Sequence, residues 1–563
     1  MPTANGITNA IAGSGNKGEA RRLGRMCLAL LGAAGIVWQG GALAQQAQPS
    51  QSVPAVSAAD VPAAADTRQV DISEYIVRGN TVLDARTIEK AVTPFLGPKR
   101  TLKDIEGARD ALLAAYNAKG YQSVYVDLPE QQVADGIVFL QVSETKVGRV
   151  RVVGSQYNSP SEIRNQVPAL KEGAVPDFTQ AQAELTALNR GGKRQVMPLV
   201  KQGAMPGTMD VDLKVDDSSP WRGSVGLNND YSADTHHLRA SASIGYDNLW
   251  QLGHSLSLSF FGTPQDFSET RVWSASYSAP LRGTNWSIEA NGYISNSNVS
   301  TVGGTSVLGK GHSIGVKAVY TVPTAGEWYH SFSAGVDFKD NKEGLRLGAT
   351  GDDVPLRYAP VTLGYAGFRQ GERTQYGLNL SMVTGTRSFF GYGSNEAQFD
   401  YKRYKSSPSF TLFKADLNGS YTLPGNEQVG GRLSAQLTDS ALISTEQMAA
   451  GGASSVRGYL SAEATGDYGL VGSLELRSRP LVWLNPWVEN WRVYAFTDGG
   501  YLRLRDPLPE QNDSFNLASV GLGTNFTLVQ RISGRLDLAY PLKKASRTEA
   551  HDWRLNFSVN ANY

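Results

Sequence analysis

The last eleven residues, Trp553-Arg554-Leu555-Asn556-Phe557-Ser558-Val559-Asn560-Ala561-Asn562-Tyr563, alternate strictly between apolar and polar side chains. Because successive side chains of a β-strand point to opposite faces, this segment predicts a strand with one apolar and one wet face. Its length is close to the ~10 residues with which a tilted strand crosses a bilayer. The alternation recurs upstream, as in Leu238 to Tyr246, and about sixteen such segments follow Trp221. The sequence therefore predicts a mainly β protein with a transmembrane antiparallel β-barrel over residues 220–563.

Loop lengths give a separate test of this barrel. Transmembrane barrels have short turns at the periplasmic end and longer loops outside. If the strand at Trp221 runs outward, long loops should follow the odd strands, as the gaps Lys342–Pro360, Thr386–Ser407 and Ser440–Gly466 do. Short links follow the even strands. The link Pro480–Asn490 is an exception, because it follows an even strand and is longer than the others. A soluble β-sandwich or propeller also explains the alternation and stays as an alternative, but it does not predict this parity.

Composition limits the classes of function. The 563 residues carry 53 Lys and Arg against 52 Asp and Glu, a formal net charge of +1, so no bulk attraction to nucleic acid is expected. The apolar run Met26 to Val37 is shorter than the ~20 residues of a membrane helix, which excludes a helical membrane protein. The histidines lack H-E-x-x-H spacing, and the Walker and G-x-S-x-G motifs are missing. We therefore expect no catalysis, no cofactor and no metal site.

The amino terminus indicates export from the cytoplasm. Three arginines precede the apolar run, and Ala42-Leu43-Ala44 supplies the small residues at which signal peptidase cuts. We predict a signal peptide over residues 1–44. Residues 45–68 are rich in Ala, Gln, Ser and Pro and predict a flexible linker. The single cysteine, Cys27, lies within the signal, so the mature chain is expected to have no disulfide.

Between the linker and the barrel, one pattern of elements occurs twice. Residues 69–146 show the order strand, helix, helix, strand, strand, and residues 147–219 repeat it. In such a fold the middle strand lies at the sheet edge, where unpaired backbone groups can accept an extended peptide. The edges are predicted at Ser123–Val126 and Val196–Lys201.

This tandem βααββ pattern resembles POTRA domains, the periplasmic modules that precede outer-membrane barrels in protein-transport machines. The stretch from Leu188 to Arg194, with Pro198 and Gly203 to Thr208, is similar to the second POTRA domain of two-partner secretion transporters. Two generic α+β domains remain an alternative. The resemblance implies that the domain edges bind the exported protein, and the candidate contacts are Ser123, Tyr125, Lys193, Arg194, Val196 and Lys201.

Two motifs in the barrel resemble parts of the same superfamily. Val456-Arg457-Gly458-Tyr459, in the gap after the eleventh strand, resembles the tip of an outer loop that folds back into the lumen. This resemblance implies an inward-folded loop at 440–466, called the inward loop below. Phe496, Asp498 and Gly500, two strands later, share one face and resemble an F-x-D-x-G wall motif. Together the motifs imply that Arg457 pairs with Asp498 inside the barrel. Alone, Arg457 would be interpreted as a solvated loop charge.

The carboxy terminus adds two signals. Leu536 to Leu542 looks like the penultimate strand of the superfamily. The terminal aromatic Tyr563, with Phe557, resembles the signal by which outer-membrane barrels are handed to their assembly machinery. A tyrosine of the interfacial aromatic belt is the simpler alternative, and both can hold.

The whole pattern resembles the TpsB (ShlB/FhaC/HecB-like) outer-membrane transporters of two-partner secretion. This resemblance implies a monomeric pore with its POTRA domains in the periplasm, which exports an exoprotein carrying an amino-terminal secretion domain. Outer-membrane lipid and the barrel-assembly machinery are the other expected partners. A barrel insertase of the same superfamily and a passive porin are the alternatives, and the presence of two rather than more repeats favours secretion. The Pro-containing linker is poor for the plug helix that related transporters often carry.

Overall fold

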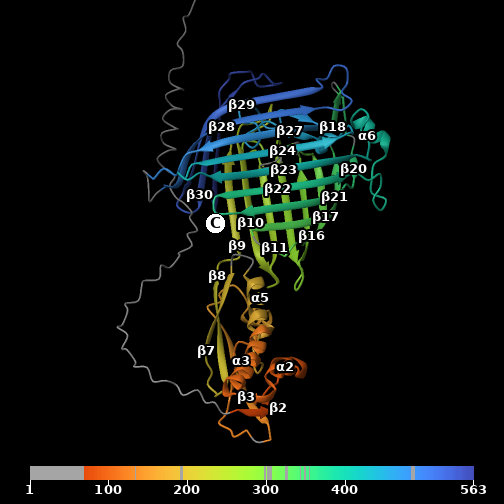
Figure 1. Cartoon of the computed structure of the whole chain (residues 1–563). Coiled ribbons are helices and arrows are strands. Elements are labelled where there is room, and N and C mark those ends of the chain that lie inside the picture. The colour runs from red at the N-terminus through yellow and green to blue at the C-terminus, as the bar shows by residue number, and fades with distance from the viewer. Residues whose placement is uncertain are drawn as a thin grey trace, which may run out of the picture. The chain divides into compact units, whose positions relative to one another are not determined.

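The structure is a computed structural model that describes residues 69–133, 135–189, 194–296, 299–300, 307–323, 327–342, 344–347, 350–353, 355–482 and 488–563. The predicted signal peptide and linker and the candidate contact Lys193 lie outside these residues. The described chain divides into two compact units, which meet in sequence between Pro220 and Trp221 (Figure 1). Each unit has its own sheets and core.

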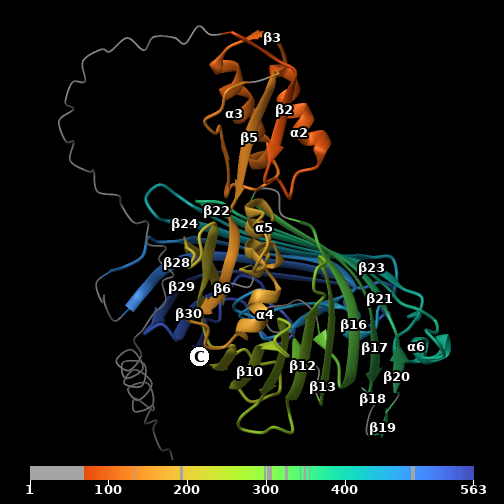
Figure 2. The same ribbon diagram turned by 90° about the horizontal axis from the view of Figure 1, so that it is seen from below.

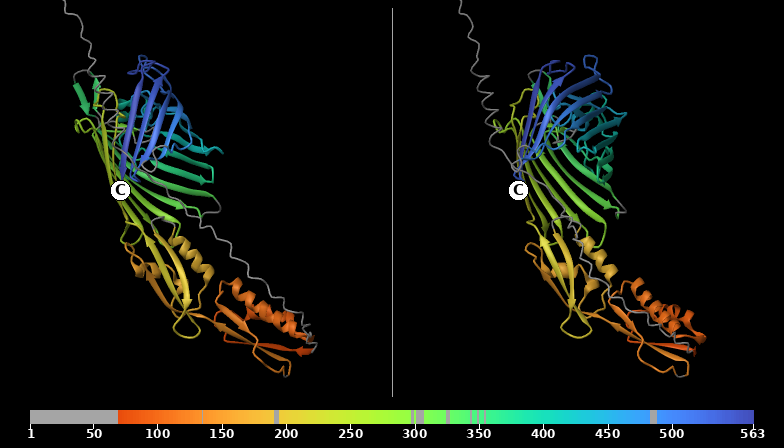
Figure 3. Two further views of the ribbon diagram at one scale, coloured as in Figure 1. Left: turned by 90° about the vertical axis from the view of Figure 1, so that its left-hand side faces the viewer. Right: turned by 60° about the vertical axis from the view of Figure 1, so that its left-hand side comes forward.

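The smaller unit begins with a domain whose three-stranded sheet has the order β2-β5-β4. Strand β2 (Glu74–Arg78) is parallel to the central β5 (Ile137–Glu144), and β4 (Val124–Asp127) pairs antiparallel to β5 at the edge. Helices α2 (Ala85–Val92) and α3 (Leu102–Ala118) lie together on one face of this sheet (Figure 3). The edge position predicted for the middle strand is therefore present.

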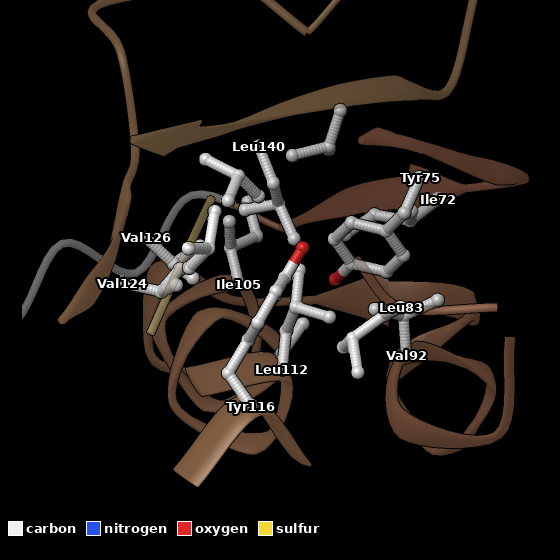
Figure 4. Close-up of a cluster of buried hydrophobic side chains, with 14 residues drawn as sticks. Ile72, Tyr75, Leu83, Val92, Ile105, Leu112, Tyr116, Val124, Val126 and Leu140 are labelled. Atoms are coloured by element: carbon white, nitrogen blue, oxygen red, sulfur yellow. The ribbon is translucent and has the colours of Figure 1, made fainter. Parts of the chain in front are cut away.

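Helix α3 shows why the first domain folds this way. It begins at a capping box in which the Asp104 carboxylate accepts hydrogen bonds from the Thr101 backbone N–H and hydroxyl. It ends before Gly120, whose φ of +90° suits a glycine after a helix. Its buried residues Ile105, Ala108, Leu112 and Tyr116 recur every three or four positions and face the sheet core (Figure 4).

Three short elements of this domain were not predicted. Strand β1 (Val70–Ile72) pairs with β3 (Gly97–Arg100), and a 3-10 turn η1 (Thr93–Phe95) follows α2. They are too short to produce a recognisable apolar period.

The second domain repeats the arrangement. Its sheet has the order β6-β8-β7, with β6 (Lys146–Val153) parallel to the central β8 (Thr208–Asp217) and β7 (Arg194–Gln202) antiparallel to it at the edge. Helices α4 (Pro160–Asn165) and α5 (Phe178–Leu188) cover the buried face, and the 3-10 turn η2 (Pro168–Leu170) joins them. Among the described helices, none has the length and apolar character needed to cross a membrane.

Residues from Trp221 onward close into an antiparallel barrel in which each strand pairs with the next one and β31 pairs back to β9 (Figures 1 and 2). The strands are β9 (Trp221–Asn228), β10 (Arg239–Leu249), β11 (His254–Gly262), β12 (Arg271–Pro280), β13 (Trp286–Ser295), β16 (Gly311–Thr321), β17 (Trp328–Asn341), β20 (Leu356–Tyr358), β21 (Val361–Gln370), β22 (Thr374–Thr384), β23 (Thr411–Thr422), β24 (Gln428–Thr438), β27 (Tyr468–Arg477), β28 (Val488–Arg503), β29 (Ser514–Leu528), β30 (Ile532–Pro541) and β31 (Arg554–Asn562). Because β20 and β21 both pair with β17, they form one interrupted strand. The described residues thus form a ring of sixteen strands, and the predicted fold class is confirmed.

The two faces of the barrel wall follow the predicted alternation. In β27 the side chains of Leu470, Leu474 and Leu476 are exposed on the outer face, whereas Ser473 between them is 5% exposed and faces the lumen. Near the short turns, aromatic pairs such as Trp286 with Tyr320 lie on the outer face. Such pairs are typical of the aromatic girdle at a membrane interface.

The longer connections follow the odd strands, as the loop parity predicted. Several contain elements of their own, which the sequence did not predict. These are β14 (Val299–Ser300), β15 (Val307–Leu308), β18 (Gly344–Leu347), β19 (Thr350–Asp353), α6 (Glu396–Lys402), η3 (Ser444–Glu446), β25 (Met448–Ala450) and β26 (Ala464–Gly466). Figure 2 shows α6 beside β20 and β21.

Candidate functional site in the barrel lumen

The inward loop, residues 440–466 between β24 and β27, folds into the barrel. At its tip Val456, Arg457 and Tyr459 are 0% exposed, although they belong to a connection between strands. Gly458 has φ +101°, and a Cβ there would lie 3.4 Å from both Pro541 N and Ser519 Cβ. The left-handed backbone therefore favours a glycine at this position, which packs directly against β29 and β30.

Arg457 is held by the wall motif that the sequence predicted. Its Nε and Nη2 donate to the two carboxylate oxygens of Asp498, each at 2.7 Å, and its backbone N–H donates to Asp498 Oδ2 at 2.9 Å. Asp498 is 3% exposed. This bidentate arrangement is the strong form of a guanidinium–carboxylate pair. The contact expected between the two motifs is present.

The other members of the wall motif make room for the loop and support it. The Phe496 ring lies under the Arg457 guanidinium, with 3.5 Å between Cζ and the ring centroid, a cation–π distance. A Cβ on Gly500 would lie 3.3 Å from Val456 Cγ2 and 3.5 Å from Ala450 Cβ, both in the loop. Phe496, Asp498 and Gly500 share the lumen face of β28. On this one face the motif places an aromatic ring under Arg457, a carboxylate that binds it, and a glycine that leaves space for the loop.

Tyr459 fixes the loop to a neighbouring part of the wall. Its hydroxyl lies 2.8 Å from the Lys543 carbonyl oxygen and 3.0 Å from that of Ala518, the two acceptors within reach of its single hydrogen, and its oxygen accepts from the Ala518 N–H at 3.2 Å. Val456 packs in a buried cluster with Met448, Val471 and Leu502. All four residues of the tip motif are therefore engaged with the loop's own residues or with the wall.

Three further residues of this site were missed by the sequence analysis. Arg457 Nη1 donates to Glu475 Oε1 at 2.7 Å and lies 3.5 Å from Asp537 Oδ1, and Nη2 donates to Ser473 Oγ at 2.9 Å. With Arg457 and Asp498 they form what we call the tip network. Glu475 and Asp537 are acidic residues between outward leucines on strands β27 and β30. Their place on the polar face of an alternating strand was the sequence feature that could have pointed to a position in the lumen.

Further arginines surround the tip network. Arg477 Nη2 lies 2.6 Å from Glu475, and Arg535 Nε lies 2.7 Å from Asp537. Arg432 adds a fourth guanidinium, and its Nη2 donates to the Ser455 carbonyl of the inward loop at 2.8 Å. Four guanidinium groups thus surround three carboxylates, and each carboxylate accepts hydrogen bonds from at least one arginine. Such a network can hold a loop in place, which is a mechanical role. Within the described residues, no group of three or more His, Cys, Asp and Glu is placed to hold a metal ion.

The candidate contacts on the first domain are of two kinds. Tyr125, on the edge strand β4, is 63% exposed and can meet a partner. Ser123 precedes β4, is 6% exposed, and donates to the Thr145 carbonyl at 3.3 Å. Its side chain is therefore not available to a partner.

The edge of the second domain is open along only part of β7. Val196 is 2% exposed and belongs to the core, so it offers no side chain to a partner. Its N–H and C=O point away from β8 and are bonded by the Asn189 side chain at 2.8 and 3.0 Å. Because peptide orientation alternates along an antiparallel strand, the peptide groups of Pro198 and Val200 point off the same edge. The open edge therefore lies after Val196.

Two basic candidates on β7 already have partners in the domain. Arg194 donates to the Leu188 carbonyl at 2.8 Å and to Asn158 Oδ1 at 3.2 Å. Lys201 Nζ lies 2.6 Å from Asp212 Oδ2, and the side chain is still 57% exposed. Lys201 can reach a partner only as a member of this ion pair.

Asp212 makes the second domain sensitive to acid. Hydrogen bonds from Arg151 and Lys201 lower the pKa of the Asp212 carboxyl to about 2. In the unfolded chain its pKa is ~3.9, so the stabilisation is complete above that pH and is lost as pH falls through about 2. We expect Asp212→Asn to lower the urea midpoint of the isolated 69–220 unit at pH 7. The difference from wild type should disappear in strong acid, as measured by circular dichroism.

The matched control is Asp210→Asn, because Asp210 has one cationic partner, Arg149 at 3.2 Å, whereas Asp212 has two, Arg151 and Lys201. A single pair with an exposed arginine contributes less than two, so this variant should unfold closer to wild type than Asp212→Asn does. Equal effects of the two variants at pH 7 would contradict the role given to Asp212.

The two carboxy-terminal candidates lie at the seam where the barrel closes. The Tyr563 N–H donates to the Gly223 carbonyl at 2.8 Å, which continues the β31–β9 pairing. Its side chain is 74% exposed on the outer face. Just beyond the end of β9, the Phe557 N–H donates to Asn229 Oδ1 at 2.7 Å, and the Phe557 carbonyl accepts from the Asn229 N–H at 3.3 Å.

Comparison with known proteins identifies the family. The protein-family model described as haemolysin secretion/activation protein ShlB/FhaC/HecB matches residues 207–526, more than half of the chain. The chain belongs to this family. A ShlB-type POTRA domain model matches residues 70–145.

Relatives of the family support the same assignment over most of the chain. The outer membrane transporter CdiB of Escherichia coli is 24% identical over 484 residues, 84% of this chain and 79% of the relative. The heme/hemopexin transporter protein HuxB of Haemophilus influenzae (strain 86-028NP) is 23% identical over 483 residues, 83% of each chain. The expected family, outer-membrane location and transporter function are thereby confirmed.

Solved structures show the same fold. CdiB from Escherichia coli superposes with a TM-score of 0.59 at 18% identity, covering 99% of this chain and 100% of that one. BamA from Haemophilus ducreyi lacking POTRA domains 1–3 superposes with a TM-score of 0.52 at 16% identity, covering 88% and 100%.

Proposed function

We propose that this transporter captures an unfolded exoprotein in the periplasm through its POTRA domains and conducts it through the barrel lumen to the cell surface. The observation that carries the proposal is the attachment of the inward loop to the lumen wall through Arg457 and Asp498. A loop that is buried and held inside the barrel is placed to control passage. The open β7 edge gives the second domain a surface for an extended chain.

The recognition step uses the edge strands. Val200 is 49% exposed with its peptide group off the sheet, and Tyr125 is exposed beside the β4 edge. An extended secretion domain would add a strand there, beside the exposed Lys201 side chain, which stays paired with Asp212. Folding of the exported chain at the surface supplies direction, because the sequence has no NTPase motif.

The remaining expected partners follow from the barrel. Outer-membrane lipid contacts the leucine-rich outer face, and the assembly machinery recognises the terminal strand with Phe557 and Tyr563. We propose that the transporter works as a monomer, binds no nucleic acid and catalyses no reaction. Release of a large secreted protein encoded beside this gene should require this chain, and unchanged release after gene deletion would refute the proposal.

A barrel insertase is the second candidate function, and the β31–β9 seam distinguishes the two. An insertase that hands strands to the membrane must open this seam, whereas export through the lumen leaves it closed. The seam is paired from Ser558 with Asn228 to Asn562 with Ser224. We expect a disulfide between Ser224→Cys and Asn562→Cys to leave export within about twofold of the reduced form. Export is measured in the culture medium with and without reductant.

The control for the seam experiment is a disulfide across two neighbouring strands that no mechanism opens. Ser287 pairs with Val319 between β13 and β16, so Ser287→Cys with Val319→Cys tests the general effect of a wall disulfide. Loss of export with the seam disulfide alone would favour the insertase. Ion conductance that never responds to an exported polypeptide would favour a passive porin.

A further inference from the structure

The inward loop has a second attachment, on a part of the lumen wall distant from the tip network. Glu446 is 2% exposed, and its Oε1 accepts hydrogen bonds from Lys339 Nζ at 2.6 Å and from the Tyr358 hydroxyl at 2.7 Å. Lys339 lies on β17 and Tyr358 on β20, opposite each other in the ladder. We call these three residues the second attachment.

The two attachments lie far apart around the ring. Lys339 is on the seventh strand and Asp498 on the thirteenth of the sixteen. The chain between Glu446 and Arg457 therefore runs from one part of the wall to another across the lumen. A loop fixed at both ends in this way obstructs the path of a polypeptide.

The inward loop also packs in two separate halves. Leu442 and Ile443, before Glu446, belong to a buried cluster with Leu356, Tyr358, Val383, Phe399, Phe410 and Leu412. Met448, Ala450, Val456, Tyr459 and Ala464, after it, belong to a different cluster with Val471, Leu502 and Leu517. Gln447 stands between the halves, and its side chain donates to Asp467 Oδ1 at 3.0 Å. Asp467 Oδ1 also accepts from the Leu442 N–H at 3.1 Å and so links the two halves. The halves share no buried cluster, so separating them near Gln447 breaks polar contacts at Asp467 and no common apolar core.

The two attachments differ in how many bonds hold them. The Arg457 guanidinium is 0% exposed and bonds to Ser473 and to three carboxylates. The Glu446 carboxylate is held through one oxygen, and the Lys339 side chain is 19% exposed. The backbone there has further support, because the Glu446 carbonyl accepts from Gln436 Nε2 at 2.9 Å and Thr445 Oγ1 accepts from Asn341 Nδ2 at 3.0 Å. The second attachment contains one ion pair with the wall, against three at Arg457, so we expect it to open at lower cost.

We infer that Glu446, Lys339 and Tyr358 form a latch that detaches when the pore opens, while the tip network stays in place. This inference rests on the proposed export through the lumen. The three side chains are positioning residues, because they act by holding the loop. Detachment at Glu446 moves the first half of the loop away from the second and leaves Arg457 on Asp498.

Locking the latch tests the inference. Lys339→Cys and Glu446→Cys are introduced in a Cys27→Ser background, so that the engineered thiols are the only two cysteines. The purified full chain is placed in planar lipid bilayers in KCl, and the opening frequency is recorded before and after a thiol-cleavable bismaleimide cross-link. Without the cross-link the ion pair between positions 339 and 446 is lost, and the opening frequency should rise about fivefold over wild type. With the cross-link it should fall at least about tenfold below that of the uncross-linked form and recover on cleavage.

A matched pair on the same two strands provides the control. Asp340 and Arg357 pair at 3.0 Å between β17 and β20, one position away from the latch, and neither contacts the loop through this bond. A cross-link between Asp340→Cys and Arg357→Cys should leave the opening frequency unchanged. Equal behaviour of the two cross-linked pairs would overturn the latch.

A charge exchange separates the latch from a general effect on folding. Lys339→Glu and Glu446→Lys should each raise the opening frequency, and the double variant should return it toward wild type because the pair is restored. All variants should run as folded, heat-modifiable barrels on gels. Failure of the double variant to restore the closed state would count against the ion pair. A barrel that never conducts, locked or unlocked, would instead argue against the export route itself.

Discussion

Arg457→Ala should reduce export at least about 100-fold while leaving a folded barrel in the outer membrane. The substitution removes the partner of Asp498, which is 3% exposed, and leaves Glu475 and Asp537 without the central guanidinium. Breaking one side of a desolvated pair costs ~3–5 kcal/mol. Hydration of the lumen reduces this cost, but a fraction of it still shifts the loop equilibrium by two orders of magnitude.

The measurement compares the exoprotein in the medium with that in the cells by quantitative immunoblot. Heat-modifiable migration of the barrel shows that the strands still close, because the ladder bonds of β28 do not depend on the Arg457 side chain. Asp498→Ala should give the same result, since it removes the other half of the pair. The effects of the two substitutions on export should not add in the double variant, as expected for partners in one network.

The matched control is Arg503→Ala. Arg503 pairs with Asp513 at 2.7 Å on the adjoining loop, but the two side chains are 40% and 52% exposed. An exposed pair contributes little, so export should stay within about twofold of wild type. Normal export by both Arg457→Ala and Asp498→Ala would show that the loop attachment is dispensable.

Val200→Pro should lower export about tenfold without unfolding the second POTRA domain. Proline removes the N–H that points off the β7 edge, so an added strand would lose a hydrogen bond and meet the ring. The bonds between β7 and β8 run through the alternate residues, such as Leu199 opposite Asp212, and are kept. Export and direct binding of the exoprotein's amino-terminal segment to the 69–220 unit measure the effect.

Val200→Ala is the control because it shortens the side chain and keeps the N–H. It should export and bind close to wild type, which separates the loss of the peptide donor from the loss of apolar surface. Equal binding by the proline and alanine variants would place the recognition surface elsewhere. The β4 edge at Tyr125 would then be the next region to test.

Most of the fold could be predicted because β-strands leave a regular pattern in the sequence, the alternation of apolar and polar residues. Alternation over ten residues predicts a strand and its two faces, as in Arg554 to Asn562, and loop lengths give the direction of each strand. Elements inside the loops carry no such signal. Helix α6 has seven residues and is held by tertiary contacts such as Phe399 on Tyr358, which only the folded chain provides.

The site was predicted in part for a related reason. Arg457 and Asp498 were found because each belongs to a motif, and a motif is a local pattern. Glu475 and Asp537 are single acidic residues on wet faces, and nothing local distinguishes them from other polar lumen positions. Glu446 is harder still, since its partners Lys339 and Tyr358 lie about a hundred residues away in sequence and meet it only through the closed ring.

The pairing of β31 with β9 has a consequence for how the barrel enters the membrane. An even ring places the start of β9 and the end of β31 at the same rim, where the Gly223 carbonyl meets the Tyr563 N–H. The barrel can therefore be laid down as eight hairpins, and neither end of the chain has to be threaded across the bilayer. Each outer loop crosses as a closed bend, and the inward loop crosses with the hairpin of β24 and β27. Asp498 lies on β28, in the next hairpin, so Arg457 can dock only when the two hairpins are side by side, and its ion pair joins them.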